Sequence, residues 1–311
     1  MTRSPALRVL ILLAVCSVAA GCAGARPHAA TPGQSSAASA SAAAEPSSAT
    51  SSSAIARSST LPAVGANPSQ LAAQIAAAEA ALSRDGAPAA ASTRQALIIQ
   101  LACLKLATHH GWARRVIRAV PRTWRAAAAA DVRATADLVA LTQPEPRLPP
   151  WRIIAAPSQS KLRADYRAAH AATGVGWSYL AAINFVETDF GRIAGPSTAG
   201  AQGPMQFIPA TWAIYGRGDI HRPRASIMAA ARLLRANGAL RAIGPALHAY
   251  NPSWLYVDAV LRYARRLRAS PGSFTSYYRR QVICHLARGW VWLPRDYGTN
   301  PAAHAIAVHM H

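Results

Sequence analysis

Acidic residues are scarce in this sequence. Its 311 residues include only 12 Asp and Glu, against 33 Lys and Arg. Lysine is nearly absent too, since Lys105 and Lys161 are its only examples, so the net charge of +21 comes almost entirely from arginine. A surface this basic favours a polyanionic partner. The shortage of carboxylates restricts acid chemistry to a few positions, and two of these, Glu187 and Asp189, stand together in INFVETDFGR.

The apolar run near the start is too short to span a bilayer. VLILLAVCSVAA has about 12 residues, follows Arg3 and Arg8, and is typical of the core of a signal peptide. It ends in AAGC, which resembles the lipobox of bacterial lipoproteins, whose cysteine is lipidated. We therefore expect residues 1–22 to be a lipoprotein signal peptide with lipidation at Cys22, in preference to an ordinary cleaved secretory signal. The protein would be exported and anchored to the outer face of the cell membrane, in the cell envelope.

The expected location narrows the choice of partner. From His221 to Trp290 there are 12 arginines and a single acid, Asp258. Nucleic acid is the usual partner of such a basic face, but none is expected outside the membrane. Anionic cell-wall polymers or the membrane surface fit better. The alternative is that these arginines are solvated helix faces that reflect a compositional bias.

Aromatic residues are missing from residues 23–66, which are rich in Ala, Ser, Pro and Thr. Such a segment cannot bury enough apolar surface to offset its chain entropy. We expect a disordered linker that tethers a folded module to the membrane.

Cysteine is also rare, with four residues in the chain. Cys16 and Cys22 belong to the expected signal peptide and its lipidation site. Cys103 and Cys284 remain, and an even number in an oxidising compartment favours a disulfide between them. The alternative is two buried free thiols in helices.

The rest of the chain is predicted to be all-α. No alternating apolar run with hairpin turns was identified, whereas helical spacing recurs throughout. The proline-rich segment 142–151 is the best internal boundary. We expect a helical segment at residues 67–150, a second helical domain at 151–292 and a loosely ordered tail at 293–311. The predicted helices begin at Pro68 and include residues 93–107, 122–141, 158–174, 176–192, 209–216, 223–238, 238–251, 252–267 and 274–289.

Glu187 stands on an apolar helix face. Leu180, Ile183, Glu187 and Phe190 recur at helical spacing, near the C-terminal end of their predicted helix. Desolvation and the negative end of the helix dipole should both raise the pKa of Glu187, as a general acid requires. Asp189 would lie about 200° further round the helix and could not share that site. The alternative for Glu187 is a structural glutamate paired with an arginine.

Two further segments carry polar groups suited to sugars. QGPMQFIPATW places Met205, Gln206 and Phe207 in a turn before a new helix. Gln206 offers a donor and acceptors for sugar or peptide amides, and its neighbours supply an apolar floor. HAYNPSWLYVDAV places Tyr250 and Asn251 at the end of another helix.

In order and spacing, VETDFGR, GPMQFIPATW and AYN followed by WLYVDAVLRYA resemble the motif series of bacterial lytic transglycosylases. These are goose-lysozyme-like enzymes, and the first motif resembles the membrane-bound lytic transglycosylase B type. The resemblance covers residues 158–268, about a third of the chain. It implies a lysozyme-like all-α catalytic domain at 151–292, preceded by an additional helical segment. It also implies a peptidoglycan lyase that cleaves the β-1,4 bond between MurNAc and GlcNAc and forms 1,6-anhydro-MurNAc, without metal or cofactor.

The same resemblance assigns roles to residues. Glu187 matches the single carboxyl that acts first as acid and then as base, and Thr188 matches a Ser or Thr that hydrogen-bonds the sugar. The turn that lines the glycan groove is matched by Met205 and Gln206, with Phe207 beside them. The pair near the catalytic carboxyl and the N-acetyl group is matched by Tyr250 and Asn251.

The small number of Asp and Glu residues agrees with a mechanism that uses one glutamate. A two-carboxylate hydrolase needs a second acid roughly 5 to 10 Å from the first. Beyond residue 150, the other acids are Asp165, Asp189, Asp219, Asp258 and Asp296. Two alternatives stay open: a muramidase of the same fold that uses water, and a non-catalytic cell-wall-binding lipoprotein.

Three tryptophans, Trp177, Trp212 and Trp254, could stack on sugar rings. Buried aromatic residues at helical spacing more often belong to the core, so the sequence assigns them no site.

Overall fold

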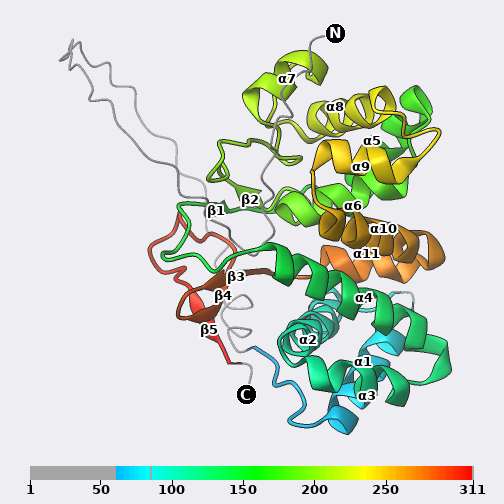
Figure 1. Cartoon of the computed structure of the whole chain (residues 1–311). Coiled ribbons are helices and arrows are strands. Elements are labelled where there is room, and N and C mark those ends of the chain that lie inside the picture. The colour runs from blue at the N-terminus through cyan, green and yellow to red at the C-terminus, as the bar shows by residue number, and fades with distance from the viewer. Residues whose placement is uncertain (1–60, 85, 310–311) are drawn as a thin grey trace, which may run out of the picture. The chain divides into compact units, whose positions relative to one another are not determined.

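The computed structural model describes residues 61–84 and 86–309 (Figure 1). The signal peptide, the lipidation site Cys22 and nearly all of the linker expected at 23–66 lie outside the described residues. Within the described part of the chain, none of the helices combines the length and the apolar character that crossing a membrane requires.

The described chain is mostly helical. Asn67 begins the first helix, since its side chain accepts a hydrogen bond from the N–H of Gln70 and Pro68 occupies the first turn. The helices are α1 (Pro68–Leu82), α2 (Ala89–Thr108), α3 (His110–Ala119), α4 (Arg122–Leu141), α5 (Gln159–Thr173), α6 (Trp177–Thr188), α7 (Pro209–Tyr215), α8 (Pro223–Ala236), α9 (Ile243–Tyr250), α10 (Trp254–Ala269) and α11 (Pro271–Tyr278). Every helix predicted before residue 270 is present, with small differences at the ends.

Helices α1 to α4 pack around one apolar core, which includes Leu71, Ile75, Ile99 and Val132. Helix α4 also packs along α10 from the second half of the chain, and α10 in turn packs on α6 (Figure 1). Helix α6 is buried on most of its surface, because its apolar and small residues face neighbours on several sides. The fold thereby encloses the helix that carries Glu187.

The expectation of an all-α chain is wrong at its C-terminal end. The strands are β1 (Arg152–Ile153), β2 (Ile193–Ala194), β3 (Val282–Leu286), β4 (Gly289–Leu293) and β5 (Ile306–Val308). Strands β3, β4 and β5 form an antiparallel sheet in that order, with Cys284 opposite Val291 and Trp290 opposite Val308. The predicted helix at 274–289 ends at Tyr278, and the tail expected to be loosely ordered supplies β5.

The physical reason lies in the residues of the hairpin. Val282, Ile283 and Val291 are β-branched, and such side chains fit a pleated surface better than a helix. Gly289 has a φ of 119°, which the turn between β3 and β4 requires and other residues rarely adopt.

The disulfide expected between Cys103 and Cys284 does not form, and both thiols are free and buried. Cys103 lies on α2 in the core of the first four helices. Cys284 lies on β3, in a separate core beneath the sheet. Each thiol is enclosed by its own set of apolar neighbours, and burial raises the pKa of Cys103 to about 12.

A buried ionic cluster joins the two halves of the described chain. Asp131 of α4 accepts hydrogen bonds from the Tyr277 hydroxyl at 2.6 Å and from Arg280 at 2.9 Å. Arg266 of α10 donates to both carboxylate oxygens of Glu79 of α1, at 2.7 and 3.0 Å. The boundary expected at 142–151 is therefore a connection within one compact unit, since helices on either side of it share buried charges.

A buried lysine holds the stretch that leads into α1. Lys105 is almost fully buried on α2, and its ammonium group donates to the carbonyl oxygen of Gly65 at 3.0 Å. The N–H of Gly65 donates to the side chain of Gln74 on α1 at 2.8 Å. Side chains from α2 and α1 thus both hydrogen-bond to Gly65, and we call these two contacts the Gly65 clip.

Candidate active site

Glu187 occupies the last turn of α6 and is only 1% exposed. Its Oε1 accepts a hydrogen bond from the hydroxyl of Tyr256 at 2.8 Å. Its Oε2 is buried and has no hydrogen-bond partner among the described residues. Tyr256 is thus the hydrogen-bond partner of this carboxyl group and no arginine pairs with it among the described residues, which is contrary to the alternative of a structural glutamate held by an arginine.

Burial raises the pKa of Glu187 to about 8, and the hydrogen bond from Tyr256 opposes that rise. A carboxyl with this pKa is mostly protonated at neutral pH and can donate its proton. The carboxylate left behind is a stronger base than an ordinary glutamate.

Two tyrosines form a layer beside the carboxyl group. Tyr256 comes from α10 and Tyr250 from the end of α9, and their rings are parallel with centroids 6.4 Å apart. The hydroxyl of Tyr250 donates to the carbonyl oxygen of Met205. This layer connects Glu187 to the turn that follows α6 in the chain.

That turn, residues 202–207, is tightly constrained. The backbone of Gln202 pairs with that of Phe207 in both directions, at 2.8 and 2.9 Å. Gly203 has a φ of 72°, and a Cβ there would lie 2.1 Å from the carbonyl oxygen of Ile220, so only glycine fits. Gln206 also has a positive φ, of 48°, which is strained for a side chain of this size.

The turn holds the three residues predicted for the glycan groove, Met205, Gln206 and Phe207. Met205 and Phe207 are buried, and the ring of Phe207 packs edge-on against Tyr250. Gln206 uses its Nε2 to donate to the carbonyl of Gly203, while its Oε1 is buried without a partner among the described residues. A strained residue with an unsatisfied acceptor fits a binding role better than a structural one.

Thr188 differs from its expected role. It is fully buried, and its hydroxyl donates to the carbonyl of Pro204 at 2.6 Å while accepting from the N–H of Gly191 at 3.0 Å. Asn184 donates to the same carbonyl at 2.8 Å. The Thr188 hydroxyl therefore links the end of α6 to the turn at residues 202–207. Its proton is already used in the bond to Pro204, so it cannot donate to a sugar in this structure.

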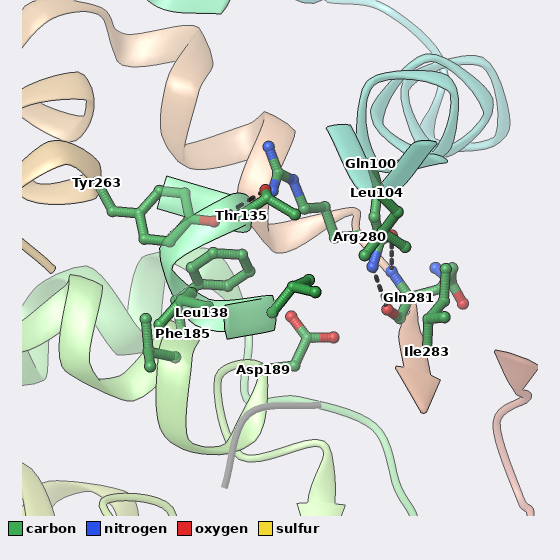
Figure 2. A pocket seen from close by; sticks show the side chains of 12 residues that line it. Gln100, Leu104, Thr135, Leu138, Phe185, Asp189, Tyr263, Arg280, Gln281 and Ile283 are labelled. Carbon is green, nitrogen blue, oxygen red and sulfur yellow. Dashed lines mark hydrogen bonds between the residues drawn. The ribbon is translucent and has the colours of Figure 1, made fainter. Parts of the chain in front are cut away.

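The prediction that Asp189 and Glu187 occupy different sites assumed that both lie in one helix, but α6 ends at Thr188 and Asp189 lies just beyond it. Asp189 and Phe190 both have positive φ values, of 51° and 62°. The Asp189 carboxylate points into a separate cavity of about 70 Å³, bounded by side chains such as Leu138, Phe185 and Arg280 (Figure 2). Burial raises its pKa to about 6, against the opposing charge of Arg192.

Asn251 is buried directly after α9. Its N–H donates to the carbonyl of Leu247 at 2.9 Å, and its own carbonyl accepts from the N–H of Ser253 at 2.8 Å. This geometry turns the chain between α9 and α10, and it places Tyr250 and Tyr256 on the same side.

Sequence reasoning missed Tyr256 as a residue of the candidate site. The sequence did contain a signal for it. A tyrosine hydroxyl buried in an apolar helix needs a hydrogen-bond acceptor, and few acceptor side chains occur on the apolar helices of this chain. Among the described residues, no group of three or more His, Cys, Asp or Glu could hold a metal ion.

The three tryptophans have different environments. Trp177 and Trp212 are partly buried, and Trp212 packs edge-on against Phe207. Trp254 is largely exposed at the start of α10.

No family model, no curated protein and no solved structure matches this chain. Its function must therefore be inferred from the site and from the motifs.

Proposed function

We propose that this protein is a peptidoglycan lytic transglycosylase that cleaves the β-1,4 bond between MurNAc and GlcNAc. The observation that carries the proposal is a single desolvated carboxyl group, Glu187, with a pKa of about 8 and a tyrosine hydroxyl on one oxygen. The motif series that resembles the lytic transglycosylases supports it independently. The proposed substrate lies outside the cell membrane, in keeping with the signal peptide and lipidation expected at residues 1–22.

In the first half of the reaction Glu187 acts as an acid. Its Oε2 proton passes to the glycosidic oxygen as the bond from that oxygen to C1 of MurNAc breaks. Tyr256 donates to Oε1 and so stabilises the carboxylate that forms. Positive charge develops at C1 of the sugar at this stage.

In the second half Glu187 acts as a base. Its carboxylate takes the proton of the C6 hydroxyl as the C6 oxygen forms a bond to C1 and closes the 1,6-anhydro ring. The carboxyl returns to its starting protonation state, so the cycle consumes no water. Gln206 and Asn251 are proposed to bind the sugar, with Met205, Phe207 and Tyr250 as the wall behind them.

The surroundings of Glu187 support this reaction over a two-carboxylate hydrolysis. Asp189, its nearest acid in the sequence, lines a cavity that Glu187 does not line (Figure 2). A hydrolase of the usual kind would need a second carboxylate within reach of the same bond.

Digestion of purified peptidoglycan tests the proposal, with mass analysis of the muropeptides released. We expect the wild type to release 1,6-anhydro ends and Glu187→Gln to release none. Reducing muramic ends would instead identify a muramidase, and no cleavage by the wild type would favour a non-catalytic wall-binding protein.

Two carboxylate variants serve as controls for the glutamate. Asp189→Asn keeps the shape of a buried acid outside the site, and Asp258→Asn removes an exposed acid on α10. Both should retain cleavage. Loss of activity in Asp189→Asn with full activity in Glu187→Gln would reverse the assignment.

A further inference from the structure

A second cavity lies between the segment that follows β1, the end of α11 and the strands β3 and β4. Its volume is about 210 Å³, and neither Glu187 nor Asp189 lines it. The apolar part of its wall is almost fully buried and consists of Ile153, Val282 and Leu293. One water molecule needs about 10–15 Å³ of such space, so the cavity is large enough for a polyatomic ligand.

Three arginines line this cavity, and no Asp or Glu of the described residues does. Arg192 lies just before β2, Arg279 directly after α11 and Arg295 two residues after β4. The guanidinium carbons of Arg192 and Arg279 lie 4.7 and 5.8 Å from the centroid of the same ring, that of Tyr278. The fold thus brings three positive charges from separate segments to one cavity, which we call the arginine pocket.

The three arginines differ in how far their charge is compensated. Arg192 forms an ion pair with Asp189 at 3.3 Å and donates to its backbone carbonyl at 3.0 Å. Arg295 is exposed and lies 3.7 Å from Asp296. Arg279 takes part in none of the ion pairs of the described chain. Its Nε is buried and has no hydrogen-bond partner among the described residues, which calls for a ligand that accepts a hydrogen bond.

We propose that the arginine pocket binds a phosphomonoester, through the terminal phosphate group. A guanidinium group bonds phosphate oxygens through parallel N–H donors, and the buried Nε of Arg279 supplies one of these donors. Charges of one sign beside an apolar wall attract an anion more strongly than charges in open water, because the wall limits screening. The site is additional to the reaction proposed for Glu187 and does not depend on it.

The arrangement of donors favours a phosphomonoester over a carboxylate. A carboxylate has two oxygens, and a single guanidinium fork can bind both of them. A phosphomonoester has three free oxygens and a charge of about −1.5 to −2 at pH 7. Arg279 and Arg295 reach the cavity from different segments, so they can bond to different oxygens of one tetrahedral group.

Calorimetry with glycerol 3-phosphate at constant ionic strength gives the first test. Arg279→Gln should weaken binding at least about tenfold, because a charged hydrogen-bond partner is lost. Arg279→Lys should recover only part of that loss, since an ammonium group lacks the planar fork. Arg295→Ala should weaken binding about two- to fivefold, because that charge is more exposed. Unchanged affinity in both Arg279→Gln and Arg295→Ala would overturn the site.

Arg288→Ala is the matched control for charge. Arg288 is exposed in the turn between β3 and β4, and it does not line the pocket. Its removal subtracts the same charge from this strongly basic protein and should leave the affinity unchanged. An equal loss in the control would assign the binding to net charge and overturn the pocket. Arg192 is left intact, because it also donates to the carbonyl oxygen of Tyr278 and its loss would disturb the fold.

Two further probes test the ligand class. Acetate should give no measurable binding, and dimethyl phosphate should bind more weakly than glycerol 3-phosphate, since it has one free oxygen and one charge fewer. No binding of glycerol 3-phosphate by the wild type, or an equal affinity for acetate, would overturn the proposal.

Sedimentation with phosphatidylcholine vesicles that contain phosphatidic acid distinguishes a lipid headgroup from a soluble phosphate. Weaker sedimentation of Arg279→Gln than of Arg288→Ala would place the phosphate on a lipid. Equal sedimentation of the two, with glycerol 3-phosphate binding still lost in Arg279→Gln, would identify a soluble ligand. Peptidoglycan cleavage should be the same in wild type and Arg279→Gln, so the failure of either proposal leaves the other intact.

Discussion

Burial gives Glu187 the raised pKa that the proposed mechanism needs, and the same burial lowers the stability of the fold. Its pKa of about 8 lies above the ordinary value of 4.5, so the folded state binds more protons than the unfolded state between these two values. The contribution of Glu187 to the free energy of unfolding is therefore highest below pH 4.5 and falls as the pH rises towards 8. A protein that kept this acid only for structure would gain stability by losing it.

Glu187→Gln should be more stable than the wild type, by about 2–3 kcal/mol at pH 7. The amide keeps the acceptor for Tyr256 but cannot ionise, so it escapes the desolvation penalty. Urea unfolding at pH 5, 6, 7 and 8 measures the gap, which should grow with pH. Asp258→Asn, at an exposed acid, should show no such growth, and a constant gap for Glu187→Gln would contradict the raised pKa.

Tyr256→Phe should move the alkaline limb of kcat/KM to higher pH. The hydroxyl donates to the ionised carboxyl and lowers its pKa, so its removal raises that pKa further, by up to about one unit. Activity requires the protonated acid and falls as the pH rises through this value. Tyr263→Phe is the control, because Tyr263 is a buried tyrosine of the same helix that contacts Thr135 rather than Glu187. Equal profiles for the two variants would contradict the role of Tyr256.

At the residue scale, the sequence predicted the isolation of Glu187 but not how the isolation arises. Helical spacing predicted different directions for Glu187 and Asp189, but Asp189 lies just past the end of α6 and its direction is set by a left-handed backbone. The left-handed backbone at Asp189 and Phe190, and the use of Thr188 as a fastener, depend on contacts with Pro204 that the helix pattern does not contain. Tyr256 was missed because its partner lies 69 residues away.

At the scale of elements, buried charge holds α4 against the second half of the chain. Asp131 is fully buried between the Tyr277 hydroxyl and the guanidinium groups of Arg280 and Arg266. Pairs of this kind add little net stability over apolar packing, but removal of one partner leaves the others uncompensated.

Asp131→Ala should lower the free energy of unfolding by about 3–5 kcal/mol, because Arg280 would lose its buried counter-ion and Arg266 would keep only Glu79. Asp258→Ala, which removes the exposed partner of Arg262, should lower it by less than about 1 kcal/mol. Urea denaturation compares the two. A small effect at Asp131 would mean that water or another group already compensates the arginines.

Helices were predicted better than strands, and the hairpin shows why. Every helix before residue 270 has caps, glycines or prolines at its ends, which are local signals. The stretch from Gln281 to Leu286 is a short apolar run, which is compatible with either a helix or a strand. The choice between the two depends on the length of the run and on the segments that pack against it. Pairing of Trp290 with Val308 brings together residues that no local pattern connects.

At the scale of the molecule, the first four helices are part of the structure that supports the site. The sequence suggested a separate segment before a catalytic domain, because the proline-rich stretch 142–151 is a strong local boundary. The packing of α4 on α10 and the ion pair between Glu79 and Arg266 cross that boundary.

A fragment that begins at residue 151 should therefore fail to fold cooperatively. It would expose the face of α10 that packs on α4 and leave Arg266 and Arg280 without Glu79 and Asp131. Near-UV circular dichroism should show no sharp thermal transition for it, whereas residues 61–311 should melt in one step. A cooperative transition in the fragment would establish an independent domain.

The Gly65 clip has a mechanical consequence. A pull on the chain from its N-terminal side reaches Gly65 before it reaches α1, and there it meets Lys105 of α2 and Gln74 of α1 together. The tension would be shared between contacts to α2 and α1 instead of acting on the first turn of α1 alone. A protein that worked while tethered would thus keep the helices behind Glu187 free of strain until the clip gave way.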